Sequence, residues 1–445
     1  MNHFLNEYLW QPIWEKSKGE KVSAYTAFLK EASLWSRDEL NRFRNQRLQH
    51  LIQHAYQRVP YYREIMRAKG LSPDDICTVE DLHKLPVLAR ADLQQAKDQL
   101  IAKGTDIRKC IKGASSGSTG EPVVFYHDKS TETAGKAARR FCWMMGGWRS
   151  GDANVTVWGN PHTVQKDWSR ISSRAKARLM REHRIPAFRL SDRRFLDDAL
   201  DRIYQYPPDF IDGYTNSIFV LAARAQEREL GTLGSKGVFT TAEQLLVHQR
   251  NCIEEMFGPV YDQYGSSEIN GVAFQCKERC GYHILEPHVV VEFEDLGMGN
   301  TKALVITDLD NYTMPFIRYR IGDLAVVGEN NACSCGLPFA KFVEVVGRKI
   351  DLIQTPQGGY LLVPSFLGGK IFKEVKGVRQ HQVVLKKDGV IEVRLAMDGA
   401  LTSENRERIT TYLESYLGDD MPFCVKVVSE IPVSPNGKYK LLVKE

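Results

Sequence analysis

Five short segments of the chain carry residue types that bind phosphates, nucleosides and metal ions. In chain order they are ASSGSTGEP at 114–122, YDQYGSSE at 261–268, TDL at 307–309 with PFIRYRIGDL at 315–324, GRKID at 347–351 and SPNGK at 434–438. Glycines let a backbone approach an anion closely, hydroxyls can surround a phosphate, and carboxylates suit hard cations. Each segment alone is also compatible with an ordinary turn or a solvated strand face. Their order and combination indicate nucleotide chemistry.

The first of these segments is a candidate phosphate-binding loop. Its small hydroxyl residues and two glycines stand before the apolar run VVFYH at 123–127, which predicts a strand. It is not a Walker A loop, because no Gly-Lys-Ser/Thr closes it and a strand rather than a helix follows. The alternative interpretation is a polar surface turn.

Four of the nine cysteines stand in two close pairs, Cys276 with Cys280 and Cys333 with Cys335. Tetrahedral Zn²⁺ takes four Cys or His ligands, commonly from two close pairs separated by a long loop. We therefore expect a structural zinc site, and note that His283 and His288 lie near it in the sequence. A catalytic zinc is excluded for this set, because four cysteines leave no coordination position open. The alternative is that the thiols are buried as small apolar groups or lie inert at the surface.

The stretch 166–194 is strongly basic, with ten Lys or Arg residues against three Asp or Glu. Four of its arginines have the spacing of one helix face: Arg170, Arg174, Arg178 and Arg181. Such a face is commonly just solvated. The functional alternatives are contact with an anionic acid, with the phosphate of a cofactor or with a polyanion, and the sequence does not choose among them.

The composition is that of a globular protein with nearly balanced charge. Of 445 residues 43% are hydrophobic, and 60 Lys and Arg stand against 55 Asp and Glu. This excludes a disordered chain, a collagen-like repeat and a coiled coil, and gives no reason to expect a nucleic-acid partner. No run approaches the roughly 18 apolar residues of a membrane span, and the N-terminus lacks the apolar core of a secretion signal. Five cysteines stand singly, which favours a reducing compartment, so we expect a cytoplasmic protein.

Hydrophobic patterning divides the chain into blocks. Residues 1–105 are mostly helical, and a helical stretch at Arg37–Ala68 is broken at Pro60. Short β-rich runs at 122–127, 154–160 and 237–241 then alternate with helices at Lys129–Met145 and Ser217–Glu229, which predicts an α/β sheet. Further strands are expected at 288–294, 302–309, 316–328 and 341–347. From about residue 350 a small α+β unit follows, with strands in 381–397 and 424–431 and a helix at Ser403–Leu417.

Taken together, these segments resemble the adenylate-forming superfamily of acyl-CoA synthetases. The chain is most similar to the phenylacetate–CoA ligase branch, with its capsule-cluster CapK and coenzyme F390 synthetase-like relatives. The predicted helical segment at 40–66 and the segment LHKLPVL at 82–88 also resemble that branch, so the resemblance runs from about residue 30 to 441. It implies an α/β fold, in which a large N-terminal adenylate-forming domain with mixed sheets and helices precedes a small mobile α+β C-terminal domain.

The resemblance also implies the domain boundaries: a large domain at 1–346, a hinge at 347–351 and a small domain at 352–445 that carries the catalytic lysine. In relatives the small domain rotates about this hinge between an adenylating and a thioester-forming pose. The usual hinge Asp or Lys stands two residues after the arginine, where this chain has Ile350 followed by Asp351. This departure weakens the expectation of the CoA step more than that of adenylation. The segment PQGGYLL at 356–362 is expected near the pantetheine channel.

The resemblance assigns an ATP site residue by residue. The glycine-rich loop would hold the phosphates through Ser115, Ser116, Gly117, Ser118, Thr119 and Gly120. Tyr264 resembles the aromatic residue that stacks on adenine, Asp262 would reach the adenine amino group, and Asp323 would accept hydrogen bonds from both ribose hydroxyls. Glu121 replaces the lysine of many relatives, which removes one positive charge near the triphosphate. The other expected nucleotide contacts are Ala242, Glu243, Gln263, Gly265, Ser266 and Arg348.

The chemistry implied by the resemblance needs cationic groups around two approaching anions. A carboxylate attacks the α-phosphate of ATP and pyrophosphate leaves, so catalysis is mostly positioning and charge stabilisation. Glu268 resembles the Mg²⁺-binding glutamate, Arg348 the arginine beside the ribose and phosphate, and Lys438 the lysine that reaches in from the small domain. The acid pocket is expected in the stretch 210–219, at Tyr214, Asn216 and Ser217.

The resemblance implies an acid–CoA ligase that uses ATP and Mg²⁺ to convert a carboxylic acid and CoA into acyl-CoA, AMP and pyrophosphate. The alternative is an adenylating enzyme that passes the acyl group to an amine or a carrier protein. A third reading, nucleotide binding without catalysis, is disfavoured by the intact set of Glu268, Asp323, Arg348 and Lys438. The expected partners are a small carboxylic acid, ATP and the acceptor, with no nucleic acid and with a homodimer left open. The sequence does not name the acid, and aryl acids are expected only from the branch it resembles.

Overall fold

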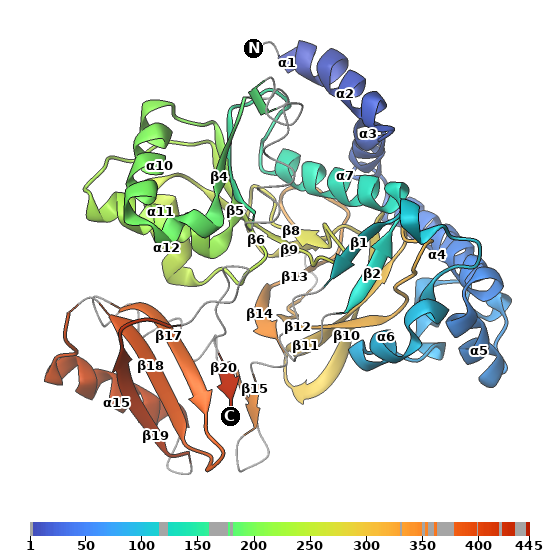
Figure 1. The fold of residues 1–445 in the computed structure, drawn as a ribbon. Coiled ribbons are helices and arrows are strands. Elements are labelled where there is room, and N and C mark those ends of the chain that lie inside the picture. The colour runs from blue at the N-terminus through green and yellow to red at the C-terminus, as the bar shows by residue number, and fades with distance from the viewer. Residues whose placement is uncertain are drawn as a thin grey trace. The chain divides into compact units, whose positions relative to one another are not determined.

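The computed structural model describes residues 3–114, 123–159, 177–178, 181–329, 332–348, 352–354, 360–362, 378–397, 399–417, 421–431 and 442–445. The chain divides into two compact units, Met1–Asp152 with Tyr261–Val345, and Ala153–Val260 with Val346–Glu445. Figure 1 labels their helices and strands. The predicted division into a large domain, a hinge and a small domain stays a prediction.

The first unit begins with a run of helices. They are α1 (His3–Leu5), the π-helix η1 (Asn6–Trp10), α2 (Gln11–Lys18), α3 (Val22–Ala32), α4 (Arg37–Arg58), α5 (Pro60–Ala68), α6 (Arg90–Ala96) and α7 (Lys129–Met145). Short 3-10 turns lie between them at η2 (Pro73–Asp75), η3 (Val79–Lys84), η4 (Lys97–Leu100) and η5 (Ile107–Lys109). Ser36 and Glu39 form a capping box at the start of α4. Pro60 is the first residue of α5, where its missing N–H costs nothing, so the predicted break at Pro60 is confirmed.

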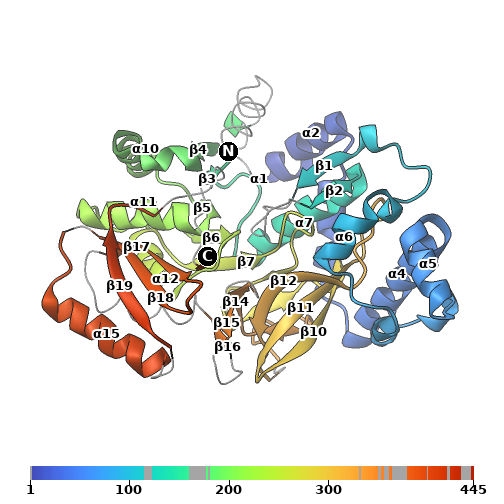
Figure 2. The same cartoon turned by 60° about the horizontal axis from the view of Figure 1, so that its bottom comes forward.

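Three small sheets complete the first unit. Strands β1 (Ile111–Ala114) and β2 (Val124–His127) form an antiparallel pair. A second sheet has the order β10 (Val289–Met298), β11 (Thr301–Asp308), β12 (Tyr319–Val326) and β14 (Glu344–Arg348), and its strands β10 to β12 lie side by side in Figure 1 and Figure 2. In a third sheet, the strands of this unit follow the order β13 (Lys341–Phe342), β9 (Tyr282–Ile284), β8 (Ala273–Phe274) and β7 (Val260–Tyr264). Apolar residues of all three sheets share one core with helices α4 and α5.

Two expectations for this unit need correction. The run 341–347 forms two strands rather than one, because the chain turns at Val343, whose N–H donates to the Val326 carbonyl, and β13 and β14 join different sheets. Arg318 and Arg320 also do not form a merely solvated face, because each pairs with a glutamate of β10, Glu292 and Glu294.

In the second unit, residues 153–260 form a parallel sheet with helices. The strand order is β6 (Gly237–Thr241), β5 (Phe210–Tyr214), β3 (Asn154–Trp158) and β4 (Glu182–Pro186). The helical elements are η7 (Ala187–Ser191), α10 (Arg193–Gln205), α11 (Thr215–Glu227) and α12 (Val247–Met256). Strands β5 and β6 are buried along nearly their whole length, as parallel strands covered on both faces usually are. The carboxyl ends of β3, β5 and β6 lie at one edge, because their registers pair Val157 with Gly213 and Gly213 with Thr240.

The predicted helical face of the basic tract is wrong at its C-terminal end. Arg178 is helical, but Arg181 has a left-handed backbone, with φ 53°, and β4 begins at the next residue. A turn into a strand therefore replaces the helix there. Residues 166–176 of the tract, which include Arg170 and Arg174, lie outside the described residues.

The remainder of the second unit is an α+β arrangement, as predicted. Strands β15 (Leu352–Gln354) and β16 (Tyr360–Leu362) form an antiparallel pair. A four-stranded sheet has the order β19 (Phe423–Val428), β18 (Ile391–Met397), β17 (Val378–Leu385) and β20 (Leu442–Lys444). Helix α15 (Ser403–Leu417) has the predicted bounds, and its residues Ile409 and Leu413 share a core with the sheet.

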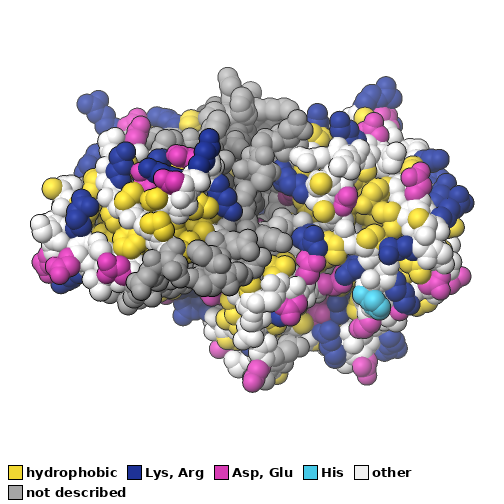
Figure 3. Space-filling model, turned by 90° about the horizontal axis from the view of Figure 1, so that it is seen from below, with side chains coloured by type: hydrophobic (Ala, Val, Ile, Leu, Met, Phe, Trp, Pro, Cys, Tyr) yellow, Lys and Arg dark blue, Asp and Glu magenta, His cyan; other side chains and the backbone are white. Residues whose placement is uncertain are grey.

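Two features of the described residues bear on partners. None of their helices is long and apolar enough to cross a membrane. On the face drawn in Figure 3, Lys and Arg side chains are interspersed with Asp and Glu side chains, in keeping with the small net charge of +5.

Candidate active site

The structure brings Tyr264 and Asp323 together, although they stand on different sheets and far apart in the sequence. The Tyr264 hydroxyl donates a hydrogen bond of 2.8 Å to Oδ2 of Asp323, and both side chains are buried. Tyr264 is the last residue of β7, and Asp323 lies in β12. The two residues predicted to hold adenine and ribose are therefore neighbours.

Asp262 lies on the same strand, two residues before Tyr264, and is also buried. Its carboxylate accepts a hydrogen bond of 2.5 Å from the hydroxyl of Tyr282, and its backbone pairs in both directions with Gln275. The sequence analysis did not single out Tyr282, and no motif marks it. The contact fixes the orientation of the Asp262 side chain.

Glu268 is presented by a tight loop that follows β7. The Ser266 hydroxyl accepts from the backbone N–H groups of Glu268 and Ile269, at 3.2 and 3.1 Å, and the Ser266 N–H donates to the Ile269 carbonyl. Ser267 donates to Oε2 of Glu268 at 3.1 Å. The loop ends at Gly271, which has φ +70° and where a Cβ would lie 2.4 Å from the Cβ of Ala138 on α7. Only glycine fits there, so the loop is pinned against α7.

A second group of predicted residues meets at the N-terminus of α11 in the second unit. The Glu243 carboxylate accepts from the Asn216 N–H at 3.0 Å, so it satisfies a helix N–H that has no intrahelical partner. The Asn216 side chain in turn accepts from Gln249 at 2.7 Å. Ala242 has a left-handed backbone with φ 71°. Tyr214, at the end of β5, packs its ring against Trp158 at the end of β3, with 4.3 Å between ring centroids.

Trp158 is a residue that the sequence analysis missed as a candidate. Its position in the sequence could have indicated it, because ligands of parallel sheets bind beyond the carboxyl ends of the strands and Trp158 is the last residue of β3. Ser217 lies in the first turn of α11 beside Asn216. The predicted acid-pocket residues therefore share one edge of the parallel sheet.

Several predicted residues lie outside the part of the chain that the structure describes. These are the loop Ser115–Gly120 with Glu121, the hinge residues Lys349–Asp351 and the lysine Lys438. Arg348 is described in its backbone alone, as the last residue of β14.

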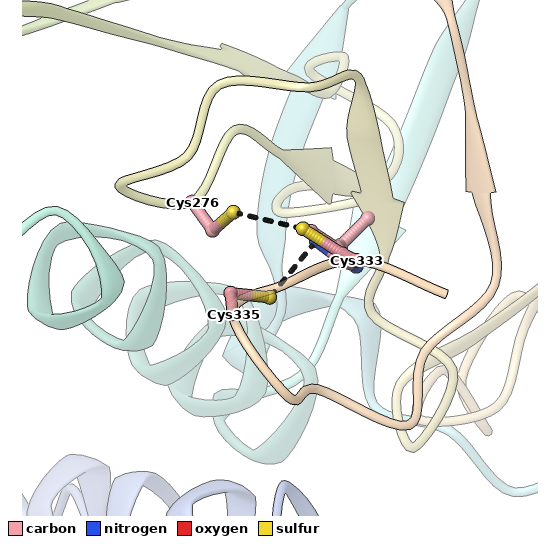
Figure 4. Close-up of side chains that lie close together, drawn as sticks. Cys276, Cys333 and Cys335 are labelled. Carbon is pink, nitrogen blue, oxygen red and sulfur yellow. Dashed lines mark hydrogen bonds between the residues drawn. The ribbon is translucent and has the colours of Figure 1, made fainter. Parts of the chain in front are cut away.

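The four predicted zinc ligands do converge in the first unit, together with a histidine. Figure 4 shows Cys276, Cys333 and Cys335 pointing toward one another. Sγ of Cys276 lies 3.7 Å from Sγ of Cys333, and Sγ of Cys335 lies 3.4 Å from Nε2 of His283. The ligand atoms of four residues all lie within 4.8 Å of one another: Cys276, His283, Cys333 and Cys335. The predicted and the geometric sets share three cysteines and differ in whether Cys280 or His283 is the fourth member.

This donor set fits a tetrahedral zinc ion. With Zn–S bonds of about 2.3 Å, two thiolates on one zinc lie roughly 3.8 Å apart, close to the 3.7 Å between Cys276 and Cys333. Cys280 is exposed and its sulfur lies only 2.9 Å from that of Cys333, shorter than such an edge. Burial raises the pKa of a thiol, but hydrogen bonds from Cys280 and from the Cys335 backbone outweigh it in Cys333 and bring the pKa to about 6. A lowered pKa favours the thiolate, which is the form that binds metal.

Three comparisons relate the chain to known proteins. Residues 355–445 match the family model of the CapK C-terminal domain. Protein CapK of Staphylococcus aureus is 25% identical over 411 residues, which cover 91% of this chain and 89% of that protein. Phenylacetate-coenzyme A ligase of Escherichia coli K12 is 30% identical over 372 residues, which cover 80% of this chain and 81% of that enzyme.

The fold matches a solved acid–CoA ligase. The crystal structure of 2-hydroxyisobutyryl-CoA ligase in the postadenylation state, in complex with 2-HIB-AMP, has a TM-score of 0.76 and 19% identity, and the match covers 94% of this chain and 92% of that one. The mixed α/β architecture with its C-terminal part is therefore that of the adenylate-forming CoA ligases.

Proposed function

Because the chain belongs to the phenylacetate–CoA ligase family, we propose that it is an ATP-dependent ligase that activates a carboxylic acid as acyl-AMP, releases pyrophosphate and transfers the acyl group to CoA. The observation that carries the proposal is the hydrogen bond between Tyr264 and Asp323, which joins the adenine and ribose candidates on two sheets of one unit. Glu268 stands four residues beyond Tyr264 on the loop that leaves the same strand. The adenine and the charged end of a nucleotide can thus be held by one strand and its loop, with the ribose held by the neighbouring Asp323.

The residues divide the work of adenylation as follows. Asp323 accepts from the ribose hydroxyls, and the Tyr264 ring stacks on adenine while its hydroxyl keeps Asp323 oriented. The loop Ser115–Gly120 holds the phosphates, and Arg348 and Lys438 supply positive charge where the acid carboxylate attacks the α-phosphate. Glu268, a buried carboxylate that accepts from Ser267, fits a hard cation. When bound there, Mg²⁺ would offset the charge of the triphosphate.

We assign the acid pocket to Tyr214, Asn216 and Ser217, and add Trp158. The two rings that pack on each other at the ends of β3 and β5 suit a flat, apolar acid, since aromatic rings pack well on one another. An aryl acid is therefore the first substrate class to test. Phenylacetate is the acid in the name of the Escherichia coli relative.

We also propose a structural zinc held by Cys276, His283, Cys333 and Cys335, with Cys280 as the exposed neighbour of Cys333. The support is the convergence of these donors from the residues just after β8, from β9 and from the segment 332–340. All nine cysteines of the chain are free thiols, which supports a reducing, cytoplasmic location. Self-association into a homodimer is a separate proposal, for sedimentation to test.

A second acceptor is kept open by one observation. The family model that matches residues 355–445 is that of the CapK C-terminal domain, and this part of the chain is where we expect the acceptor to be chosen. An amine or a carrier protein then takes the place of CoA, while the adenylation step is unchanged.

One experiment separates these possibilities. The protein is incubated with ATP, Mg²⁺, a panel of carboxylic acids and either CoA or an amine, and the products are identified by mass spectrometry. Acyl-CoA with AMP supports the proposed ligase, and an amide supports the second acceptor. If no acid yields acyl-AMP, acyl-CoA or acid-dependent pyrophosphate exchange, the proposal is wrong.

A further inference from the structure

Two buried histidines hold the backbone of the loop that carries Glu268. Nε2 of His127 lies 2.9 Å from the carbonyl oxygen of Glu268 itself, and Nε2 of His288 lies 2.8 Å from the carbonyl oxygen of Asn270. The two bonds fall on either side of Ile269. A carbonyl can only accept, so in both histidines Nε2 carries the proton.

The contacts of His288 fix its charge as well as its tautomer. Its Nδ1 lies 2.6 Å from Oδ2 of Asp310, a carboxylate that also accepts from Tyr25 and from Arg47. Both ring nitrogens therefore face acceptors, and both must donate, which makes His288 an imidazolium cation. Burial lowers the pKa of a histidine, but the hydrogen bond and charge of Asp310 outweigh it, and the pKa of His288 is raised above its ordinary value.

The polar groups around His288 are side chains of the protein itself, and most of them are charged. Tyr25 comes from α3, Arg47 from α4, and Asp308 and Asp310 from the end of β11 and the residues after it. His288, Asp308 and Asp310 are near enough to one another to be considered as metal ligands. The guanidinium of Arg47, 2.5 Å from Asp310, and the imidazolium of His288 already balance the two carboxylates. We therefore read the cluster as an anchor for the His288 ring rather than as a metal site.

His127 connects the same loop to a different part of the site. It is the last residue of β2, the strand that follows the predicted phosphate loop, and Asp128 after it caps α7 through Thr131. The loop that ends at Gly271 packs on that same helix. His127 thus links β2, the strand that follows the predicted phosphate loop in the sequence, directly to the backbone of Glu268.

We propose that His127 and His288 are positioning residues that fix the Glu268 loop for magnesium-bound ATP, acting through its backbone and without touching the nucleotide. The proposal rests on the function proposed above. A carboxylate ligand must be held in place before a hard cation binds, since any freedom of the loop has to be lost on binding. We expect the loss of either bond to raise the Mg²⁺ concentration that ATP binding requires more than it lowers turnover at saturation.

Substitution of each histidine by Asn and by Gln separates the roles of its two ring nitrogens. Asn places its N–H₂ near the position of Nδ1, and Gln places it near that of Nε2. His288→Asn therefore keeps the contact with Asp310 and loses the bond to the loop, whereas His288→Gln keeps the bond to the loop and loses the contact with Asp310. At the other histidine, His127→Asn loses the bond to the Glu268 carbonyl and His127→Gln retains it. The matched control is His54→Asn, because Nε2 of His54 lies 2.8 Å from the Tyr312 carbonyl, away from this loop.

The measurements are the Mg²⁺ concentration for half-maximal ATP binding by calorimetry, kcat and KM for ATP, and hydrogen exchange of the 265–271 amides. In the two Asn variants we expect about a tenfold rise in the Mg²⁺ requirement and in KM, the scale of one buried hydrogen bond, with faster amide exchange and kcat changed less. The Gln variants and His54→Asn should stay within about threefold of the wild type. Equal Mg²⁺ requirements in the Asn and Gln variants would overturn the proposal. A wild type that binds Mg²⁺ and ATP but activates no acid would instead count against the proposed function, and the exchange comparison would still decide the role of the histidines.

Discussion

Asp323 is the residue on which the proposed nucleotide site most directly depends. It accepts from Tyr264 inside the protein and is expected to accept from both ribose hydroxyls. An ionised carboxylate can serve all of these donors, whereas an amide cannot, because its nitrogen only donates. The residue type therefore matters as well as its position.

We predict that Asp323→Asn weakens ATP binding by roughly ten- to a hundredfold, the scale of a lost charge-assisted hydrogen bond. Tyr264→Phe keeps the ring and removes the hydroxyl that orients Asp323, so its effect should be about threefold. Calorimetry with ATP measures both, and Asp295→Asn, in an exposed pair with Lys302, is the control. Unchanged affinity in Asp323→Asn would remove this residue from the site.

The imidazolium of His288 makes a contribution to the free energy of unfolding that decreases as the pH rises. Its pKa is raised in the folded state above the ordinary 6.5, mainly because Asp310 outweighs the effect of burial. Its contribution is therefore complete below pH 6.5 and is lost as the pH rises through the folded pKa. We predict that the difference in free energy of unfolding between wild type and His288→Gln shrinks as the pH rises from about 6 to about 9. Chemical denaturation at both pH values measures it, and a constant difference would show that His288 is neutral when folded.

At the level of secondary-structure elements, the cluster of Cys276, His283, Cys333 and Cys335 joins β9 and the residues just after β8 to the segment 332–340. A metal there would brace the region that follows Glu268 against the region that follows Asp323, without touching substrate. Structural zinc contributes directly to folding free energy, so its loss should act through stability.

We predict about one zinc per chain in protein purified without added metal, as for other structural sites. Cys333→Ser and His283→Ala should lose the metal and lower the melting temperature. Cys280→Ser should retain the metal, as should the control Cys424→Ser, an exposed thiol outside the cluster. Elemental analysis decides the matter. Loss in Cys280→Ser with retention in His283→Ala would restore the set of four cysteines, and metal-free protein with unchanged melting would contradict the site.

Glu286 joins helix α4 to the segment before β13. This buried carboxylate accepts from Arg37 at 2.6 and 2.9 Å, from Arg44 at 2.8 Å and from the Ala340 N–H at 2.7 Å. Arg44 is also buried, so removal of Glu286 leaves a buried cation without its partner. We predict that Glu286→Ala lowers the free energy of unfolding by about 3–5 kcal/mol. The control Glu404→Ala breaks an exposed pair with Arg408 and should cost less than about 0.5 kcal/mol. A small loss on chemical denaturation of Glu286→Ala would contradict this role.

For the protein as a whole, the proposed chemistry needs a lysine from the C-terminal end of the chain. Lys438 lies outside the described residues and carries the charge expected at the α-phosphate. We predict that Lys438→Ala lowers acid-dependent ATP–pyrophosphate exchange by at least about a hundredfold, the usual scale for one transition-state charge contact. Lys387→Ala, an exposed lysine in the turn between β17 and β18, is the matched control. Near-wild-type exchange in Lys438→Ala would remove this lysine from the mechanism.

Much of the fold followed from the sequence, because its signals are local. Pro60 can only begin a helix, and the apolar spacing of 129–145 and 403–417 gave the observed bounds of α7 and α15. The run 341–347 was predicted as one strand, since nothing in its composition shows that Val343 turns the chain from one sheet to another. Sheet membership depends on distant partners, which a local pattern does not contain.

The same distinction holds for the site. The residue types and their order were enough to predict nucleotide chemistry at Tyr264, Glu268 and Asp323, because the types follow from the charges that must be bound. Only the tertiary structure decided which residues contact these and the other candidate residues. Tyr282, Trp158, His127 and His288 belong to no motif, and they act through hydrogen bonds and ring contacts between segments far apart in the chain. The place of His283 beside three cysteines has the same cause, since it is the pairing of β9 with β13 that turns this strand toward the segment 332–340. Sequence therefore determines which chemistry is available, and long-range packing decides which atoms are close enough to perform it.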